Sequence, residues 1–540
     1  MGLEEENRLV KDRIDKLNAL REMGVEPYPY SFDHTDHAAD ILAKHSGLAA
    51  EQQTDHKVAV AGRIMQLRGM GKATFMHIQD QTGKIQIYIR KDDVGEGAYN
   101  ILKKCDLGDI VGIKGHIFAT KTGEVSVYAE EYTLLTKTLR PMPEKYHGIK
   151  DKELRYRKRY LDLIMNQEVK DTFLKRSLML RHIRQYFDDL GFIEVETPAL
   201  QTIYGGANAR PFVTHINAWD MKMYMSISPE LYLKRLLVGG FEKVFTICKN
   251  FRNEGVDATH NPEFTMLEFY HAYVDYERVM EIFEKMVEHL AMSLHGTTKV
   301  KRMYKEEEVE LDFKAPWPRK TMEQCLKELA GVDVEGVDEE GLRQLLTNYN
   351  IEYEGTFTKG LAIQLLFEDL CEEKLIQPVH IIDQPKESTP LCKVKRGNPE
   401  LIERFESYCL GAEICNAYSE LNDPLLQRKL LEEQAAELRG GAEEAHPMDE
   451  DFVQAIEYGM PPAGGLGFGV DRMAIILLGA ESIRDVILFP TMKPTTEEMT
   501  VEEQDERIKE EMKKSLTPTE DKKKGKTEKE NREKSKARGK

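Results

Sequence analysis

Cysteine is scarce in this sequence, and the cysteines that are there follow no metal-binding or disulfide pattern. The chain has 540 residues and seven cysteines, an odd number, and no two of them form a CxxC pair. This spacing argues against a structural zinc site and against a framework of disulfides. Because unpaired cysteines are typical of the cytoplasm, we expect a cytoplasmic protein.

Long apolar runs and a secretory leader are also missing. The longest apolar run near the end of the chain, MAIILLGA at 473–480, is far too short to cross a bilayer. The N-terminal MGLEEENRLVKD is charged, unlike a signal peptide, and lacks the Ser or Thr of a myristoylation signal. We therefore expect no membrane partner.

The sequence has no standard nucleotide-binding loop. It contains no GxxxxGK[ST], and the GGLGFG run at 464–469 lacks the spacing and the acidic partner of a dinucleotide-binding fold. Any nucleotide site must therefore be built from other side chains.

Positive charge is in deficit overall and concentrated at one end. The net charge is −18, which argues against a general nucleic-acid coat. Residues 513–540 hold twelve basic and five acidic residues, so this end carries about +7 and the remainder about −25. A basic tail can add sequence-independent affinity for RNA, and a solvated end without a function is an equal alternative.

Two regions of different periodicity follow each other. Residues 1–55 are polar and mostly helical in pattern, with Leu9, Ile14, Leu17 and Leu20 able to share one face. From 56 to 140 apolar and polar residues alternate in five runs: VAVAGRIMQL, TFMHIQD, KIQIYIR, IVGIKGHIFAT and EVSVYAEEYTLL. A helical stretch, GAYNILKKC, lies between the third and fourth runs, which is the order of an OB-fold, a small barrel that often binds single-stranded nucleic acid.

The remainder predicts a second, larger domain of mixed helices and strands. A linker at 141–154 precedes it, and the domain covers 155–492 with a helical insertion at about 320–395. Beyond it, 493–540 reads as a charged tail that is largely disordered.

The stretch from Phe251 to Tyr270, FRNEGVDATHNPEFTMLEFY, has the chemistry of an active-site floor. Two strand-like runs flank a loop with turn residues, and the charged side chains lie at the base of this predicted hairpin. Arg252 and Arg472 are suited to phosphate oxygens, and Phe264 offers a flat face to a base. Glu406 and Glu413 could hold Mg²⁺ with phosphates as further ligands. Surface ion pairs and a tight glycine turn explain the same residues equally well.

Three blocks resemble the motifs of class II aminoacyl-tRNA synthetases. They are a proline-ended helix–strand passage at Pro198, the FRNE…F hairpin, and the GLGFGVDR strand–helix. The sequences between these blocks resemble those of the lysyl-tRNA synthetases in particular; examples are YGGANARPF, SPELYLKRLLVGGFEKVF and NAYSELNDP. The resemblance covers about 57–490 and implies an α+β multidomain fold: an N-terminal OB-fold β-barrel that reads the anticodon, and a catalytic domain with an antiparallel sheet flanked by helices.

The resemblance also assigns roles, residue by residue. It implies a homodimer that uses ATP, L-lysine and tRNA(Lys), with up to about three Mg²⁺ ions per subunit. Catalysis would rest on Arg252 and Arg472. The residues that it places on ATP are Arg252, Glu254, His260, Asn261, Phe264, Glu406, Gly469 and Arg472. On lysine it places Gly206, Glu230, Glu268, Tyr270, Asn416, Tyr418 and Glu420. On Mg²⁺ it places Glu406 and Glu413, and on the anticodon Phe75, Gln86 and Glu124.

The expected substrate follows from charge. Lysine has two ammonium groups, and burying an ammonium without a carboxylate is very costly, so Glu230, Glu268 and Glu420 suit it. In the similar aspartyl enzymes an arginine stands at the position of Glu420. Glu420 and Glu268 therefore disfavour an aspartyl or asparaginyl synthetase, which is the alternative within the family. A non-catalytic RNA-binding paralogue is the alternative that is not an enzyme.

Overall fold

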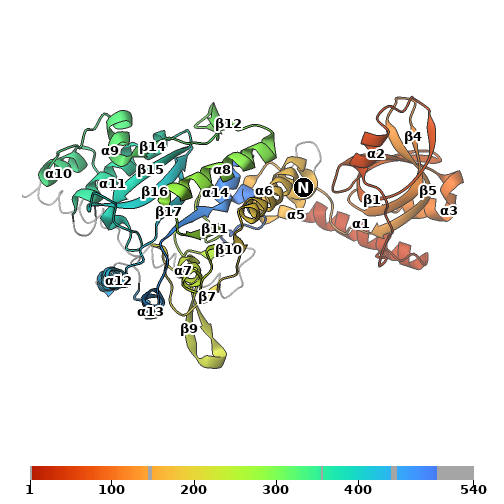
Figure 1. Ribbon diagram of the computed structural model, residues 1–540. Helices are drawn as coiled ribbons and strands as arrows, with labels where there is room; N and C mark the ends of the chain where they lie inside the picture. Colours follow the sequence, from red (N-terminus) through yellow and green to blue (C-terminus); the bar gives the residue numbers. More distant parts are fainter. Residues whose placement is uncertain (1–2, 144–148, 354–356, 440–446, 496–540) are drawn as a thin grey trace, which may run out of the picture. The chain divides into compact units, whose positions relative to one another are not determined.

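The computed structural model describes residues 3–143, 149–353, 357–439 and 447–495 (Figure 1). The chain divides into two compact units, Met1–Lys150 and Asp151–Lys540, and each is described by itself. The predicted tail at 493–540 falls outside the described residues from 496 onward. Among the residues described, no helix has both the length and the apolar character that crossing a bilayer requires.

The first unit is a five-stranded barrel with three helices, as the alternating runs predict. Helices α1 (Leu3–Glu22) and α2 (Ala38–Lys44) precede the barrel, and α3 (Lys91–Leu102) lies between its third and fourth strands. The barrel closes in the order β1-β2-β3-β5-β4. Its strands are β1 (Gln53–Met70), β2 (Ala73–Gln79), β3 (Lys84–Arg90), β4 (Ile110–Ala119) and β5 (Val125–Thr136). The OB-fold prediction is therefore confirmed.

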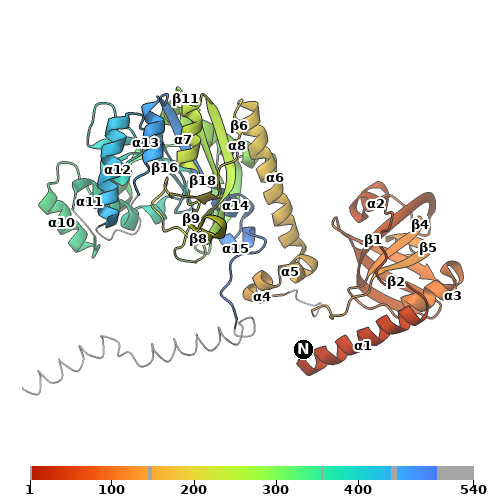
Figure 2. The same ribbon diagram turned by 90° about the horizontal axis from the view of Figure 1, so that it is seen from below.

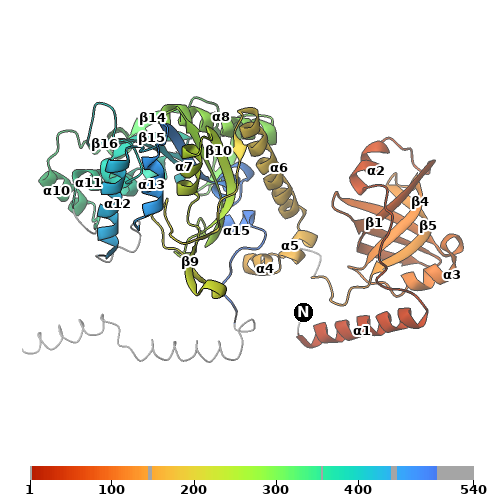
Figure 3. The same cartoon turned by 60° about the horizontal axis from the view of Figure 1, so that its bottom comes forward.

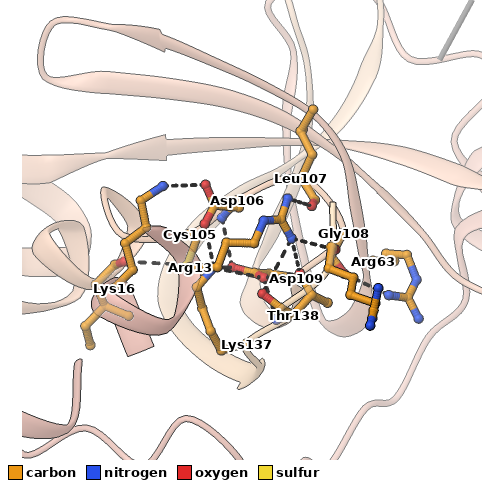
Figure 4. A network of polar contacts seen from close by, with 12 residues as sticks. Arg13, Lys16, Arg63, Cys105, Asp106, Leu107, Gly108, Asp109, Lys137 and Thr138 are labelled. Carbon is orange, nitrogen blue, oxygen red and sulfur yellow. Dashed lines mark hydrogen bonds and ion pairs between the residues drawn. The ribbon is translucent and has the colours of Figure 1, made fainter. Parts of the chain in front are cut away.

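Helix α1 packs on the barrel through a face that differs from the predicted one. Leu17 and Leu20 are buried, but Ile14 is 40% exposed and the buried place beside it is taken by Arg13. The Arg13 guanidinium donates to Thr138 Oγ1 at 2.7 Å and to the Leu107 carbonyl at 3.0 Å (Figure 4). An arginine with this many partners is stable in a buried place, and hydrophobic periodicity does not predict it.

The same network holds a fully buried lysine. Lys137 Nζ lies 2.6 Å from Asp106 Oδ2 and 2.9 Å from Asp109 Oδ2 (Figure 4). Asp109 also accepts hydrogen bonds from the amide and hydroxyl of Thr138, at 2.8 and 2.7 Å. The chain that leaves the barrel is thus fixed by paired charges rather than by apolar packing.

The second unit is built on one large sheet. Its eight strands run in the order β14-β15-β16-β17-β18-β11-β10-β6, antiparallel except for the β14–β15 and β10–β6 pairs at the two edges. The strands are β6 (Ile193–Glu194), β10 (Lys243–Phe251), β11 (Glu263–Ala272), β14 (Arg319–Thr321), β15 (Val379–Pro385), β16 (Leu401–Cys409), β17 (Ala412–Ser419) and β18 (Ala463–Gly469). The predicted antiparallel sheet flanked by helices is confirmed.

Helices cover both faces of this sheet. On one face, α6 (Gln167–Asp189), α8 (Tyr276–His295) and α14 (Val470–Leu478) share one apolar core with the sheet, and α6 lies beside α8 (Figure 3). On the other face, α7 (Glu230–Val238), α12 (Pro424–Arg439) and α13 (Glu450–Glu457) lie side by side (Figure 2). Side chains alternate along a strand, so Phe269 faces the first core and Tyr270 the second.

The predicted hairpin is present as β10 and β11. Asn250 pairs with Phe264 and Phe251 with Glu263, so residues 252–262 form the connecting loop. The strand β11 ends at Ala272, and shortly after it the Asp275 carboxylate accepts from the Glu277 amide and caps α8.

The predicted helical insertion has a strand of the main sheet within its range. Helices α9 (Met322–Cys325), η2 (Leu326–Ala330), α10 (Glu339–Asn348) and α11 (Lys359–Leu370) share a separate apolar cluster, but β15 belongs to the eight-stranded sheet. The remaining elements are α4 (Lys152–Arg157), α5 (Arg159–Met165), β7 (Leu200–Gln201), β8 (Val213–Ile216), η1 (Asn217–Trp219), β9 (Met221–Met225), β12 (Lys299–Tyr304), β13 (Glu307–Asp312), η3 (Glu372–Lys374), η4 (Lys386–Ser388) and α15 (Ile483–Val486).

Candidate active site

A cavity of about 390 Å³ opens over the middle strands of the large sheet. Strands β11, β16, β17 and β18 form its floor, and α7, α14 and the 252–262 loop supply its walls. All the residues to which the sequence assigns ATP, metal or amino-acid contacts line it, except Glu420. The assigned residues that line it are Gly206, Glu230, Arg252, Glu254, His260, Asn261, Phe264, Glu268, Tyr270, Glu406, Glu413, Asn416, Tyr418, Gly469 and Arg472.

Arg252 lies at one end of the cavity with a guanidinium that has few partners. Its Cζ lies 5.1 Å from the centre of the Phe264 ring, and Nη2 donates to the Ile227 carbonyl at 3.5 Å. Nε has no hydrogen-bond partner among the described residues. Burial lowers the pKa of Arg252, although nearby glutamates oppose this. A half-buried cation with an unused donor is suited to an anion that enters from the cavity.

Arg472, on α14, shares the opposite wall with His260. Nη2 of Arg472 lies 3.0 Å from Nε2 of His260, and Nη1 donates to the Glu413 carbonyl at 2.8 Å. Because Arg472 can only donate, Nε2 of His260 accepts and Nδ1 carries the proton toward Asp257 Oδ2, 2.9 Å away. Arg472 and Arg252 together place two positive charges at this end of the cavity, which we call its positive end.

Two residues of the connecting loop, Glu254 and Asn261, have polar atoms that form few hydrogen bonds within the loop. Glu254 Oε1 accepts from the Arg210 amide at 3.2 Å. Asn261 donates to the Glu263 carbonyl at 2.6 Å, and its buried Oδ1 has no partner in the described part of the chain. Both side chains are therefore able to contact a ligand.

Glu406 and Glu413 lie on neighbouring strands and form an acidic pair. Glu406 accepts from Arg404 Nη2 at 2.6 Å and from the Tyr408 hydroxyl at 2.8 Å. Burial and then the charge of Glu406 raise the pKa of Glu413. A cation between the two would relieve this repulsion, and two carboxylates plus phosphate oxygens are a donor set that Mg²⁺ commonly uses. No group of three or more His, Cys, Asp or Glu side chains within the described ranges is arranged to hold a metal by itself.

The other end of the cavity is acidic. Glu268 is buried and accepts from Ser228 Oγ at 2.7 Å and from the Tyr270 hydroxyl at 3.2 Å. Burial, and then the charge of Glu230, raise the pKa of Glu268 to about 8. Glu230 accepts from the Tyr418 hydroxyl at 2.6 Å. Two carboxylates so close to each other favour binding of a cation.

Gly206 permits this close packing. Its φ is +84°, and an added Cβ would lie 2.8 Å from the Glu230 Cβ and 2.8 Å from Ser228 Oγ. Any larger residue would displace Glu230 from its place in the wall.

Glu420 does not line the cavity, contrary to the simplest form of the prediction. It lies behind the floor, fully buried, with Oε2 2.5 Å from Nζ of Lys234. Oε1 has no hydrogen-bond partner among the residues described, and an added Cβ on Gly465 would lie 2.2 Å from it. Gly465 does line the cavity, so Oε1 is separated from the cavity by a residue without a side chain.

Three polar residues at the site carry no prediction from the sequence. Arg404 is buried and donates to Asn416 Oδ1 at 3.0 Å as well as to Glu406. Ser228 bonds Glu268, and Lys234 pairs with Glu230 and Glu420. A signal exists for Lys234, since Glu230 and Lys234 are spaced i,i+4 on the helix ELYLKRLLV.

The three residues assigned to the anticodon lie on β2, on β3 and immediately before β5. Gln86 donates to Glu124 Oε2 at 2.7 Å and accepts from Ser126 Oγ at 2.9 Å. The rings of Phe75 and Tyr88 are 4.6 Å apart. These side chains point away from the apolar core, because their neighbours Met76, Ile85 and Ile87 fill the barrel.

Both units match known proteins. A family model described as tRNA synthetases class II (D, K and N) matches residues 151–493, and one described as an OB-fold nucleic acid binding domain matches residues 58–135. A relative from Clostridium novyi (strain NT), named "Lysine--tRNA ligase", is 52% identical over 495 residues, which cover 91% of this chain and 95% of that protein. A relative of the same name from Carboxydothermus hydrogenoformans is 50% identical over 495 residues, 92% of this chain and 100% of that protein.

Proposed function

The chain belongs to the class II tRNA synthetases of the aspartate, lysine and asparagine group, and we propose that it is a lysine–tRNA ligase. It would activate L-lysine with ATP and transfer the lysyl group to the 3′ end of tRNA(Lys). The observation that carries this proposal is one cavity with two arginines at one end and a pair of buried glutamates at the other.

Lysine recognition is proposed at the acidic end. Glu268, held by Ser228 and Tyr270, and Glu230, held by Tyr418, supply carboxylates for the two ammonium groups. Asn416 and Arg252 lie toward the positive end and would take the substrate carboxylate. Glu420 would reach the side-chain ammonium across Gly465 with its unpartnered oxygen.

ATP is proposed to bind at the positive end. The adenine would stack on Phe264 and be covered on its other face by Arg472, while Glu254 accepts from the exocyclic amino group. Arg252, Arg472 and His260 would contact the phosphates, with Asn261 and Gly469 completing the wall. The contact between Arg252 and the Phe264 ring supports this arrangement, because it places a guanidinium that can bind phosphate beside a flat ring on which adenine can stack.

Glu406 and Glu413 are proposed to hold Mg²⁺, whose chemistry is to neutralise the charge of the triphosphate. Arg404 keeps Glu406 in place and, through Asn416, connects the metal end to the amino-acid end. The protein would supply two carboxylate ligands, and phosphate oxygens and water would supply the others.

The chemical step needs positioning rather than a side-chain nucleophile. A carboxylate oxygen of lysine attacks the α-phosphorus, a P–O bond opposite to it breaks, and pyrophosphate leaves. A 3′-terminal hydroxyl of the tRNA then attacks the lysyl carbonyl, and AMP leaves. Arg252 and Arg472 are the catalytic residues, since their fixed positive charges stabilise the negative charge that develops on the phosphate oxygens.

The barrel is proposed to bind the anticodon through Phe75, Gln86 and Glu124. An aromatic ring, an amide and a carboxylate on one face are the groups that stack on and read unpaired bases. The Gln86–Glu124 hydrogen bond supports this, because it orients both side chains before any base arrives.

A homodimer is proposed from the exposed apolar side chains near one edge of the sheet. Leu174 on α6 is 57% exposed and Ile193 on the edge strand β6 is 50% exposed. Leu200 and Val213, on the small sheet of β7, β8 and β9, are also exposed. Covering such residues with a second copy would remove them from water. A sedimentation measurement of the mass in solution tests it.

A cytoplasmic location is proposed on a separate ground. All seven cysteines are free, and six of them are buried. A protein whose thiols stay unpaired suits a reducing compartment.

The decisive experiment is charging of tRNA with each of the twenty amino acids in turn. We expect ATP-dependent charging with lysine to exceed that with aspartate or asparagine by at least a thousandfold. Charging with aspartate or asparagine instead would overturn the substrate. Absence of any amino-acid-dependent ATP–pyrophosphate exchange would favour a non-catalytic RNA-binding protein.

A further inference from the structure

The acidic end of the cavity contains a cation of its own. Lys234 is fully buried, and its Nζ lies 2.5 Å from Glu230 Oε1 and 2.5 Å from Glu420 Oε2. It does not line the cavity, whereas Glu230 does. A lysine at this depth is retained only if its charge is paired, and here two carboxylates pair it.

Its charge changes the balance of the pocket. Glu230, Glu268 and Glu420 contribute three negative charges when ionised, and Lys234 contributes one positive charge. The pocket is then left with two negative charges. Two arginines are left out of this count, because Arg252 is matched by the carboxylate of the substrate in the proposed function and Arg404 pairs with Glu406.

Both oxygens of Glu420 are accounted for by this arrangement. Oε2 is turned to Lys234, and Oε1 lies at Gly465, toward the cavity. Glu230 differs in this respect, since a single oxygen, Oε1, meets both Lys234 and the Tyr418 hydroxyl. One internal ammonium therefore orients two carboxylates that come from different elements, α7 and the residue that follows β17.

We propose that Lys234 is a specificity-determining positioning residue: a built-in cation that leaves the pocket two negative charges for the two ammonium groups of its amino-acid substrate. The inference rests on the proposed function. An amino acid with a neutral side chain would bring one ammonium and leave one buried carboxyl group either unpaired or protonated, so it would gain less from this pocket than a substrate with two ammonium groups.

The simplest competing explanation is that Lys234 only fills space. Its ammonium lies 5.3 Å from the Tyr418 ring and 6.0 Å from the Phe452 ring, so the side chain also packs in the core. The two explanations differ in what they predict when charge is removed in pairs. If charge balance matters, loss of the cation is compensated by loss of one carboxylate; if packing matters, the two losses add.

The test uses the full-length protein and ATP–pyrophosphate exchange, with the KM for lysine, the KM for ATP and kcat measured separately. In Lys234→Met, which keeps the length of the side chain, we expect the KM for lysine to rise at least tenfold and the KM for ATP to stay within about twofold. Glu420→Gln leaves the pocket with one negative charge. The double variant Lys234→Met, Glu420→Gln restores two, so we expect it to bind lysine more tightly than Glu420→Gln alone.

The comparison between the double variant and Glu420→Gln is the sharpest test. A double variant with a KM for lysine above that of Glu420→Gln would overturn the proposal, and this comparison stands even if Lys234→Met alone fails to fold. A Lys234→Met protein that loses kcat but keeps its KM for lysine would also overturn it.

Lys137 provides a matched control. It is the buried lysine of the first unit, paired with Asp106 and Asp109 (Figure 4). Lys137→Met removes a similar buried ion pair and should lower stability without moving the KM for lysine. Lysine-dependent exchange in the unsubstituted protein is measured first, so a failure of the proposed function is seen independently of the variants.

Discussion

The hydroxyl of Tyr270 donates a 3.2 Å hydrogen bond to Oε2 of Glu268, two residues earlier on the same face of β11. Ser228 donates to the other oxygen at 2.7 Å, so the carboxyl group has fixed partners before any substrate binds. Glu230 is an unfavourable neighbour of this carboxyl group. Burial and then that charge raise the pKa of Glu268 to about 8, and this has a measurable consequence for lysine binding.

We predict that lysine binding at pH 7 releases protons. With a pKa of about 8, Glu268 holds its proton at pH 7 in the empty protein, and an ammonium group binds its ionised form. The apparent affinity for lysine should therefore rise with pH between about 6 and 8, by up to about tenfold per unit. Calorimetric titrations with lysine in phosphate and in Tris, which differ in heat of ionisation, should give different heats. Glu268→Gln is the control in which the difference shrinks, and equal heats for the parent protein would refute the prediction.

Arg252→Ala should reduce lysine-dependent ATP–pyrophosphate exchange by about a hundredfold to a thousandfold. The substitution removes the positive charge that stabilises the negative charge developing on the oxygens of the α-phosphate. The side chain makes one long hydrogen bond, of 3.5 Å, to the protein, so stability should change little. Circular dichroism melting checks the fold. Near-normal exchange in the variant would remove Arg252 from the reaction.

Gly465→Ala should close the floor of the amino-acid end. The added Cβ would lie 2.2 Å from Glu420 Oε1 and 2.4 Å from Tyr270 Cε1, both of them buried side chains. We expect a loss of stability of about 1–3 kcal/mol, from overpacking, and a KM for lysine raised more than the KM for ATP. Gly255 lines the same cavity with no atom within 4 Å of its added Cβ, so Gly255→Ala should leave both constants unchanged. Equal effects of the two substitutions would contradict this account of Gly465.

Local pattern is enough to predict the barrel and the hairpin. In the barrel, alternate residues such as Ile85, Ile87 and Ile89 are buried, so the period of two is visible in the sequence. The loop between β10 and β11 is marked by its own turn residues. Both features depend on neighbours along the chain, which the sequence displays directly.

Features that depend on distant packing could not be predicted in this way. The place of Glu420 behind the floor follows from Gly465 and Lys234, which come from two other elements. The i,i+4 spacing of Lys234 from Glu230 is visible in the sequence, but it does not show that Lys234 also pairs with Glu420. Arg13 takes a buried place beside Ile14 because Leu107 and Thr138 supply acceptors that no periodicity shows.

Phe75→Ala should raise the KM for tRNA in aminoacylation and leave lysine-dependent exchange unchanged, because exchange does not use the anticodon. The Phe75 ring lies 4.6 Å from that of Tyr88 on the outer face of the barrel, and loss of a stacked base costs about 1–3 kcal/mol, which corresponds to a rise in KM of roughly fivefold to 150-fold. Tyr30, a fully exposed aromatic residue of the same unit, gives a matched control, and Tyr30→Ala should change neither assay. If Phe75→Ala lowered exchange as well, the residue would act through the fold. If it changed neither assay, the anticodon would be read elsewhere.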